Sequence, residues 1–281
     1  MASLARAVSL VENEQPGYET FLQSLPGSSA KITGITGPPG AGKSTITDAL
    51  VAAMIAQEQK VAVLCVDPSS PFHHGALLGD RIRMNEWYNH PHVFIRSLAT
   101  RGSLGGLHPR IMEIAEVVKA AGFDQVIIET VGVGQSEIEI ASLADTTVVV
   151  LVPEAGDEIQ TMKAGLMEIA DIFVVNKSDR PDADHFVKHL RSMLAPAFHR
   201  TSSEIPIIKT IATERTGVDA LWEKIQAHQQ QAKDKSWLFA ERAYHLIRQQ
   251  RMKDIDKEVL KKAWEASAEK NLYKFVQQFL H

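Results

Sequence analysis

Short apolar runs recur along most of the chain, and the majority are continuous rather than alternating with polar residues. Continuous runs are typical of strands buried on both faces of a parallel sheet. They span residues 31–37, 61–67, 92–97, 124–130, 146–152, 171–176 and 205–210. Between several of them lie stretches with helical patterning, at residues 44–57, 108–121 and 157–169. This alternation predicts an α/β fold with a doubly wound, mostly parallel sheet.

The last part of the chain has a different pattern. From about Val218 to His281 there is little Gly or Pro, and apolar residues recur at helical spacing. We expect several helices there, with an apolar stripe that serves core or dimer contacts. The predicted organisation is a short N-terminal helix and linker over residues 1–30, a main α/β domain over 31–220, and a C-terminal helical extension over 221–281 that serves dimerisation.

The loop after the first predicted strand has the phosphate-loop pattern G-x-x-x-x-G-K-[ST]. Its residues are Gly37, Pro38, Pro39, Gly40, Ala41, Gly42, Lys43 and Ser44. Glycines let the backbone turn tightly around an anion, and the helix that follows adds the positive end of its dipole. We expect Lys43 to reach the β- and γ-phosphates of a nucleotide and the Ser44 hydroxyl to bind Mg²⁺. The alternative is a Gly/Pro-rich turn, which the flanking strand and helix disfavour.

A second loop, Asn176-Lys177-Ser178-Asp179, has the N-K-x-D spacing and directly follows the apolar run 171–176. The Asp179 carboxylate suits guanine, because it accepts from N1–H and the 2-amino group together. Adenine offers neither donor, so the carboxylate would be poorly paired. We expect Asn176 to brace the loop and the Lys177 stem to lie along the base. The Ala212 N–H, after the last apolar run, is predicted to meet guanine O6. Without its context the same spacing would suit an ordinary surface turn.

Acidic residues follow two other predicted strands. Glu129-Thr130-Val131-Gly132 closes the run 124–130, where nucleotide hydrolases place an acid near Mg²⁺ and a glycine whose N–H meets the γ-phosphate. Because Glu is one methylene longer than the more usual Asp, we expect an indirect contact with the metal. Asp67 and Asp80 are further expected magnesium-shell acids. The structural alternatives are an acid capping the sheet edge, a turn at Asp67 and a helix cap at Asp80.

Composition narrows the function classes. The net charge of −4 over 281 residues argues against non-specific nucleic-acid binding as the main role. The single cysteine, Cys65, excludes an internal disulfide, and no apolar run is long enough to span a bilayer. We therefore expect a cytoplasmic protein without nucleic-acid or membrane partners. The adjacent His73 and His74 lack a nearby cysteine, so a surface or partner contact is favoured over a metal site.

Six motifs in order resemble the MeaB/ArgK family of P-loop GTPases, which belong to the SIMIBI class and act as chaperones of adenosylcobalamin-dependent acyl-CoA mutases. The motifs are GPPGAGKST, VDPSSPF…LGDRIRM, RSLATRGSLGGL, ETVGVGQSE, GDEIQTMK and NKSD, between about residues 30 and 220. The resemblance implies GTP and GDP as ligands, Mg²⁺, a homodimer and an acyl-CoA mutase as partner. It also implies that GTP hydrolysis is slow until the mutase stimulates it, while the chaperone gates cofactor loading and expels damaged cofactor.

The same resemblance assigns residues to roles. Lys43, Ser44 and Thr45 are implied to bind phosphate and Mg²⁺, with Asp67, Asp80 and Glu129 in the metal shell. The segment GDEIQTMK matches a loop that responds to the mutase, and its Gln160 and Lys163 are expected to move on activation. We hypothesise that Lys163 stabilises charge on the leaving phosphate and that Gln135 orients water.

Two features of the chain depart from the family pattern, and three alternative functions stay open. His73-His74 stand where the family often has small or polar residues, and only about thirty residues precede the phosphate loop. One alternative is a nickel-insertion GTPase, although a single cysteine and one His pair argue against it. The others are an ATP-dependent kinase, which the N-K-x-D motif opposes, and a nucleotide-binding scaffold without useful turnover.

Overall fold

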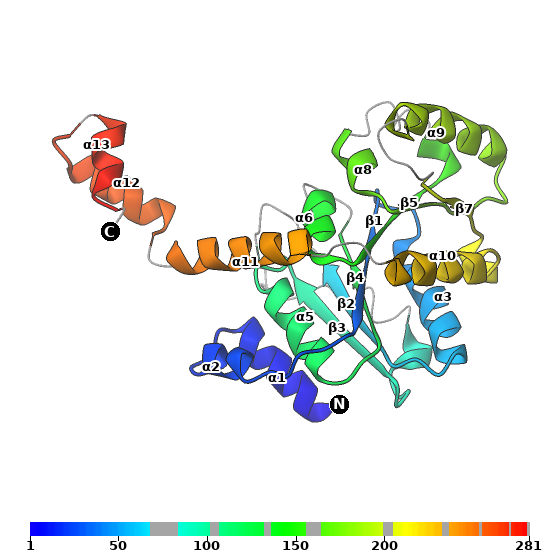
Figure 1. Ribbon diagram of the computed structural model, residues 1–281, viewed down its shortest axis with the longest axis horizontal. Helices are drawn as coiled ribbons and strands as arrows, with labels where there is room; N and C mark the ends of the chain where they lie inside the picture. The colour runs from blue at the N-terminus through cyan, green and yellow to red at the C-terminus, as the bar shows by residue number, and fades with distance from the viewer. Residues whose placement is uncertain are drawn as a thin grey trace. The chain divides into compact units, whose positions relative to one another are not determined.

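Seven parallel strands form one sheet in the computed structural model of the protein, and helices cover both of its faces (Figure 1). The structure describes residues 1–67, 84–101, 107–131, 136–155, 164–198, 205–231, 236–252, 255–269 and 271–279. The strands are β1 (Lys31–Thr36), β2 (Val61–Asp67), β3 (Val93–Ala99), β4 (Gln125–Glu129), β5 (Thr146–Leu151), β6 (Ile172–Val175) and β7 (Ile207–Lys209). Their order in the sheet is β3-β2-β4-β1-β5-β6-β7. The predicted doubly wound α/β fold is confirmed.

Alternate residues of each strand feed two apolar layers, because successive side chains point to opposite faces. Helices α3 (Lys43–Ala56) and α10 (Val218–Gln230) cover one face, where Leu50 and Trp222 are fully buried. Helices α5 (Ile111–Ala120) and α6 (Ser136–Leu143) cover the other, and α9 (Ala183–Phe198) packs against β5 and β6. The shorter helical elements between the strands are α8 (Ala164–Ile169), η1 (Asn85–Trp87), η2 (Pro153–Ala155) and η3 (Ala212–Glu214).

The sheet order places the loops with chemical motifs side by side. In parallel sheets the carboxyl ends of all strands lie at one edge, where ligands bind. The neighbours β4, β1, β5, β6 and β7 therefore bring together the loop 37–42, the acid at position 129 and the loops after residues 175 and 209. A site at this edge follows from topology before any side chain is considered.

The N-terminal segment forms two helices, α1 (Ala2–Glu12) and α2 (Tyr18–Gln23), that pack on α5. Val8 and Val11 are fully buried against the apolar layer there. Polar contacts reinforce the packing, since Arg96 of β3 pairs with Glu12 at 2.5 Å and Arg110 pairs with Glu14 at 2.9 Å. This segment is thus fastened to the middle of β3 and to the residue that directly precedes α5.

A buried histidine beside these ion pairs predicts a pH-dependent stability. The pKa of His108 is lowered from 6.5 to about 4, first by burial and then by the neighbouring Arg101 guanidinium, partly offset by Glu12. Below pH 6.5 the unfolded histidine takes up a proton that the folded one accepts only near pH 4. The stabilising contribution is therefore complete above pH 6.5 and is lost as the pH falls towards 4, by about 3 kcal/mol.

Urea unfolding at pH 7, 5.5 and 4.5 measures this loss of stability. The matched variant is His108→Asn, whose amide oxygen can replace the ring Nδ1 that accepts from the Arg110 N–H at 3.0 Å. We expect the variant to lose less stability on acidification than the wild-type protein. Equal losses of stability in the variant and the wild-type protein would show that carboxylates alone cause the loss of stability at acidic pH.

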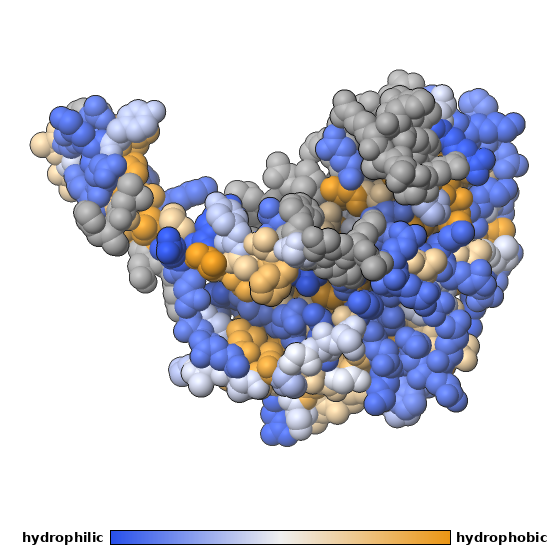
Figure 2. Space-filling model, in the orientation of Figure 1, coloured by the Kyte–Doolittle hydropathy of each residue, from blue (hydrophilic) through white to orange (hydrophobic). Residues whose placement is uncertain are grey.

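The contacts divide the chain into Met1–Ala232 and Lys233–His281. The second unit holds α11 (Ser236–Arg251), α12 (Lys257–Ala266) and α13 (Leu272–Gln277), with Phe275 buried against Trp264 at a ring-centroid distance of 5.0 Å. Apolar residues also lie on its surface, where Figure 2 shows orange patches, and Phe239 and Tyr273 are 74% and 84% exposed. The predicted domain boundaries and the dimerisation role of residues 221–281 stay predictions.

Among the helices that the structure describes, none combines the length and the apolar character needed to cross a bilayer.

Candidate nucleotide-binding site

The phosphate loop connects β1 to α3 and has three glycines with positive φ, namely Gly37 (136°), Gly40 (76°) and Gly42 (89°). These values lie where residues with a Cβ are strained, so the glycine spacing of the motif matches the shape of the loop. The side chain of Lys43 is buried and donates to the carbonyl oxygens of Gly37 at 2.9 Å and Pro38 at 3.1 Å. Its ammonium group therefore lies over the loop that would hold phosphates.

The acid at the end of β4 contacts the helix that follows the phosphate loop. Glu129 is 3% exposed and accepts from the Ser44 hydroxyl at 2.6 Å through Oε1. Its Oε2 accepts from the Thr47 hydroxyl at 2.9 Å. The hydroxyls of Thr36 and Thr130, which end β1 and follow β4, hydrogen-bond at 2.9 Å and join these two strand ends. The predicted magnesium ligand Ser44 and the predicted magnesium-shell acid thus touch directly.

The oxygen donors near the phosphate loop fit Mg²⁺. The carboxylates of Glu129 and Asp67 are buried at the ends of the adjacent strands β4 and β2, and the Ser44 hydroxyl lies beside the first of them. Mg²⁺ in nucleotide enzymes takes one or two carboxylates, and phosphates and water complete its shell. Among the described residues, no group of three or more His, Cys, Asp or Glu side chains could hold a metal ion by itself.

Asn176 joins three segments of the site. It is buried, and its Nδ2 donates to the Ala41 carbonyl of the phosphate loop at 2.9 Å. Its Oδ1 accepts from the Thr210 hydroxyl and from the Ala212 N–H, both at 3.1 Å. The predicted contact of the Ala212 N–H with guanine O6 therefore requires this amide to be shared or redirected.

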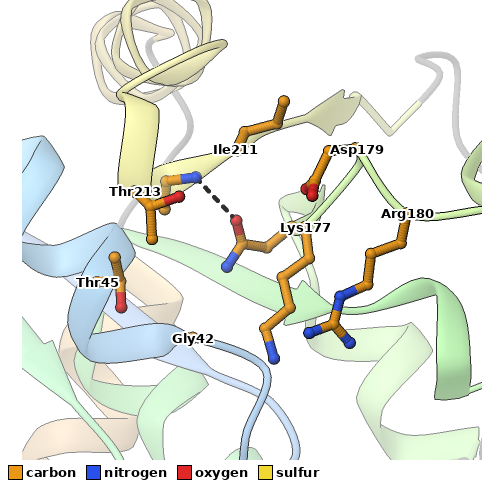
Figure 3. A pocket seen from close by; sticks show the side chains of 9 residues that line it. Gly42, Thr45, Lys177, Asp179, Arg180, Ile211 and Thr213 are labelled. Atoms are coloured by element: carbon orange, nitrogen blue, oxygen red, sulfur yellow. Dashed lines mark hydrogen bonds between the residues drawn. The ribbon is translucent and has the colours of Figure 1, made fainter.

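Lys177 crosses from the base loop to the phosphate loop. Its backbone has a positive φ of 55°, which is uncommon for a residue with a side chain and is found at functional sites. The ammonium group donates to the Gly40 carbonyl at 2.8 Å. In Figure 3 the side chain runs down towards Gly42, whereas the Asp179 carboxylate lies at the other end, near Ile211. The lysine stem thus forms one side of the pocket.

A pocket of about 210 Å³ lies between these loops. It is lined by Gly42, Thr45, Asn176, Lys177, Asp179, Arg180, Ile211, Ala212 and Thr213. Six of the residues predicted to bind nucleotide, Thr45 among them, line this pocket (Figure 3). Asp80, Gly132, Gln135, Gln160 and Lys163 lie outside the described residues, as do His73 and His74.

Sequence reasoning did not single out Arg180, which lines the pocket next to Asp179. Arg180 forms an ion pair with Glu154 of η2, and this hydrogen bond lowers the pKa of Glu154. Its place directly after the N-K-x-D motif was the available signal. Thr47 was also missed, and no local pattern marks it, because its partner Glu129 is 82 residues away.

A parallel sheet with a phosphate loop after β1, an acid after β4 and an N-K-x-D loop after β6 defines a P-loop GTPase. The comparison with protein families agrees. Residues 4–268 match the family model described as methylmalonyl Co-A mutase-associated GTPase MeaB. The chain belongs to this family and is a GTP-hydrolysing enzyme.

Individual relatives support the assignment. A Pyrococcus horikoshii protein designated a GTPase is 48% identical over 234 residues, which are 80% of this chain and 73% of the relative. The fused isobutyryl-CoA mutase of Geobacillus kaustophilus is 44% identical over 188 residues, which are 65% of this chain and 17% of that protein. Among solved structures, one described as a LAO/AO transport system kinase has a TM-score of 0.70 and 29% identity, covering 99% of this chain and 85% of its own.

Proposed function

We propose that this chain binds Mg²⁺–GTP and, through slow GTP hydrolysis, gates the loading of cobalamin into an adenosylcobalamin-dependent acyl-CoA mutase and protects or reactivates that mutase. The proposal includes a homodimer that acts in the cytoplasm. One observation carries it: a guanine-type loop meets a phosphate loop at one pocket, in a chain similar to part of a fused acyl-CoA mutase.

The nucleotide part of the proposal rests on the contacts of the site. The N–H groups of the phosphate loop and the Lys43 ammonium balance the charge of the phosphates. Asp179 reads the purine edge, while Asn176 and Lys177 hold the base loop against the phosphate loop. When bound, Mg²⁺ would neutralise developing phosphate charge, with Ser44, Glu129, Asp67 and, by proposal, Asp80 around it.

The proposed catalytic residues complete the mechanism. Lys43 contacts the phosphates from within the loop, and Lys163 stabilises charge on the leaving phosphate. Gln160 shares the mutase-responsive segment with Lys163, Gln135 orients the attacking water, and Gly132 donates to the γ-phosphate. Because four of these five residues lie outside the described residues, their roles rest on the motifs GDEIQTMK and ETVGVGQSE.

The mutase part of the proposal rests on the similarity to the fused isobutyryl-CoA mutase. In a fused protein the two activities share one chain, which suits a GTPase that acts on the mutase. We propose that this chain makes an equivalent contact as a separate protein. A nickel-insertion GTPase would call for a His-rich or Cys-based metal site, and the part of the chain that the structure describes holds no group of three or more His, Cys, Asp or Glu side chains that could bind a metal ion.

GTP turnover with and without purified mutases tests the function. We expect slow turnover alone and faster turnover with one acyl-CoA mutase, using isobutyryl-CoA mutase and methylmalonyl-CoA mutase as partners. Transfer of adenosylcobalamin to the apo-mutase, followed by its absorbance, should differ between GTP and a non-hydrolysable analogue. The control is Ser44→Ala, which lacks the proposed magnesium ligand. Turnover near zero with every mutase, although GTP binds, would instead indicate a nucleotide-binding scaffold.

A further inference from the structure

The carboxylate of Glu129 lies between two hydroxyl groups of α3. Ser44 donates to one carboxylate oxygen at 2.6 Å, and Thr47 donates to the other at 2.9 Å. All three side chains are buried, with exposed fractions of 7% for Ser44, 3% for Glu129 and 0% for Thr47. We call this arrangement the hydroxyl clamp. It fixes both oxygens of a carboxylate that stands next to the predicted magnesium ligand.

Thr47 also has an ordinary structural partner. Its hydroxyl lies 3.0 Å from the Lys43 carbonyl, one turn earlier in the helix, which is a common contact for threonine in helices. A hydroxyl has one proton, so it donates fully to only one acceptor at a time. An ionised carboxylate is the stronger acceptor of the two, because hydrogen bonds to charged groups are shorter and stronger. The geometry therefore assigns the Thr47 proton to Glu129.

The orientation of Glu129 decides where the Ser44 proton points. A hydroxyl that donates its proton to Oε1 of Glu129 turns its lone pairs away from that carboxylate, which is the orientation that a metal ligand needs. Carboxylates that orient a metal ligand in this way commonly raise metal affinity. Without Thr47, Oε2 of the buried carboxylate would lose a donor, and the side chain would rotate to recover one.

We propose that Thr47 is a positioning residue for magnesium: it holds Glu129, which in turn orients the Ser44 hydroxyl towards the metal. This inference rests on the proposed function, because it assumes that the site binds Mg²⁺–GTP. It adds a residue that neither the phosphate-loop motif nor the acidic motif contains. The effect should be on the magnesium dependence of nucleotide binding rather than on the fold.

Calorimetric titration of GTP over a series of Mg²⁺ concentrations tests the role of Thr47. Valine has nearly the shape of threonine and lacks the hydroxyl, so Thr47→Val should fold. We expect it to raise the Mg²⁺ concentration for half-maximal GTP affinity by about tenfold, as for one lost hydrogen bond to a charged group. Binding of GTP in the presence of EDTA should not change.

Two further variants separate positioning from packing. Thr47→Ser retains the hydroxyl and should keep a magnesium dependence within about twofold of the wild-type protein. Thr33→Val is the matched control, because Thr33 is equally buried and its hydroxyl accepts from Gln229 at 3.2 Å, away from the clamp. Urea unfolding of all variants reports how much stability each substitution removes.

The outcomes are distinguishable. A magnesium dependence of Thr47→Val equal to that of the wild-type protein overturns the inference, as does a Thr47→Ser variant that shifts as far as the valine variant. The same shift in Thr33→Val would assign the effect to general destabilisation and would also overturn it. If the wild-type protein binds no GTP at any Mg²⁺ concentration, the proposed function itself fails.

Discussion

Asp179→Asn is expected to lower GTP affinity by at least about a hundredfold and to create affinity for xanthosine triphosphate. The carboxylate accepts from both N1–H and the 2-amino group of guanine, whereas the Asn amide would point a donor at the 2-amino group. Xanthine carries a carbonyl at position 2, which accepts from that amide. Asp179 lines the pocket between Lys177 and Ile211, so the changed group faces the proposed base.

Calorimetry with both nucleotides at one Mg²⁺ concentration measures the exchange of base preference. The matched control is Asp182→Asn, which makes the same substitution in the same loop outside the pocket lining. Asp182 has a positive φ of 66°, a conformation that asparagine tolerates well. We expect its GTP affinity to stay near the wild-type value. Unchanged GTP affinity in Asp179→Asn would contradict the assignment of the base loop.

The sheet could be predicted from sequence because each strand is a short, continuous apolar run between polar loops. Parallel pairing follows from runs such as 61–67, where every residue is buried. The phosphate loop was equally readable, since its glycines occupy positions of positive φ that few other residues tolerate. These features depend on neighbours in sequence, and local patterns contain that information.

Contacts between distant segments were not readable in the same way. Lys177 donates to Gly40, which is 137 residues away, and Arg96 holds Glu12 across 84 residues. The first contact joins two recognised motifs, yet its partners become visible only when β1 and β6 are placed in one sheet. The second fastens an N-terminal segment that was expected to be a short helix and a linker, whereas two helices pack on α5 there.

Thr47 illustrates the same limit inside a recognised motif. The pattern that ends at Ser44 contains no position for it, and threonine in a helix usually bonds to its own backbone. Its second partner, Glu129, is set by the pairing of β4 with β1, which brings the acid beside the first turn of α3. Side-chain roles that need two elements in register therefore require the structure.

Gly37→Ala should lower the free energy of unfolding by about 3–5 kcal/mol, the largest stability effect that we expect in the site. Gly37 has a φ of 136°, and a Cβ at this position would lie 2.1 Å from the carbonyl oxygen of Val150. That oxygen belongs to β5, a buried central strand whose backbone cannot move aside without breaking its pairing with β1 and β6. Both the strained φ and the steric clash therefore add to the loss.

Gly40→Ala separates these two contributions. Gly40 lies in the same loop with a φ of 76°, but a Cβ there would meet nothing within 4 Å. Only the cost of the positive φ remains in Gly40→Ala, so we expect its free energy of unfolding to fall by about 1–2 kcal/mol. Urea unfolding of both variants without nucleotide measures the difference. The carbonyl oxygen of Gly37 also accepts from the Lys43 ammonium group. The Gly37→Ala variant should therefore lose more GTP affinity than the strained φ alone would cause. Equal losses of stability in the two variants would mean that the β5 carbonyl does not confine the phosphate loop.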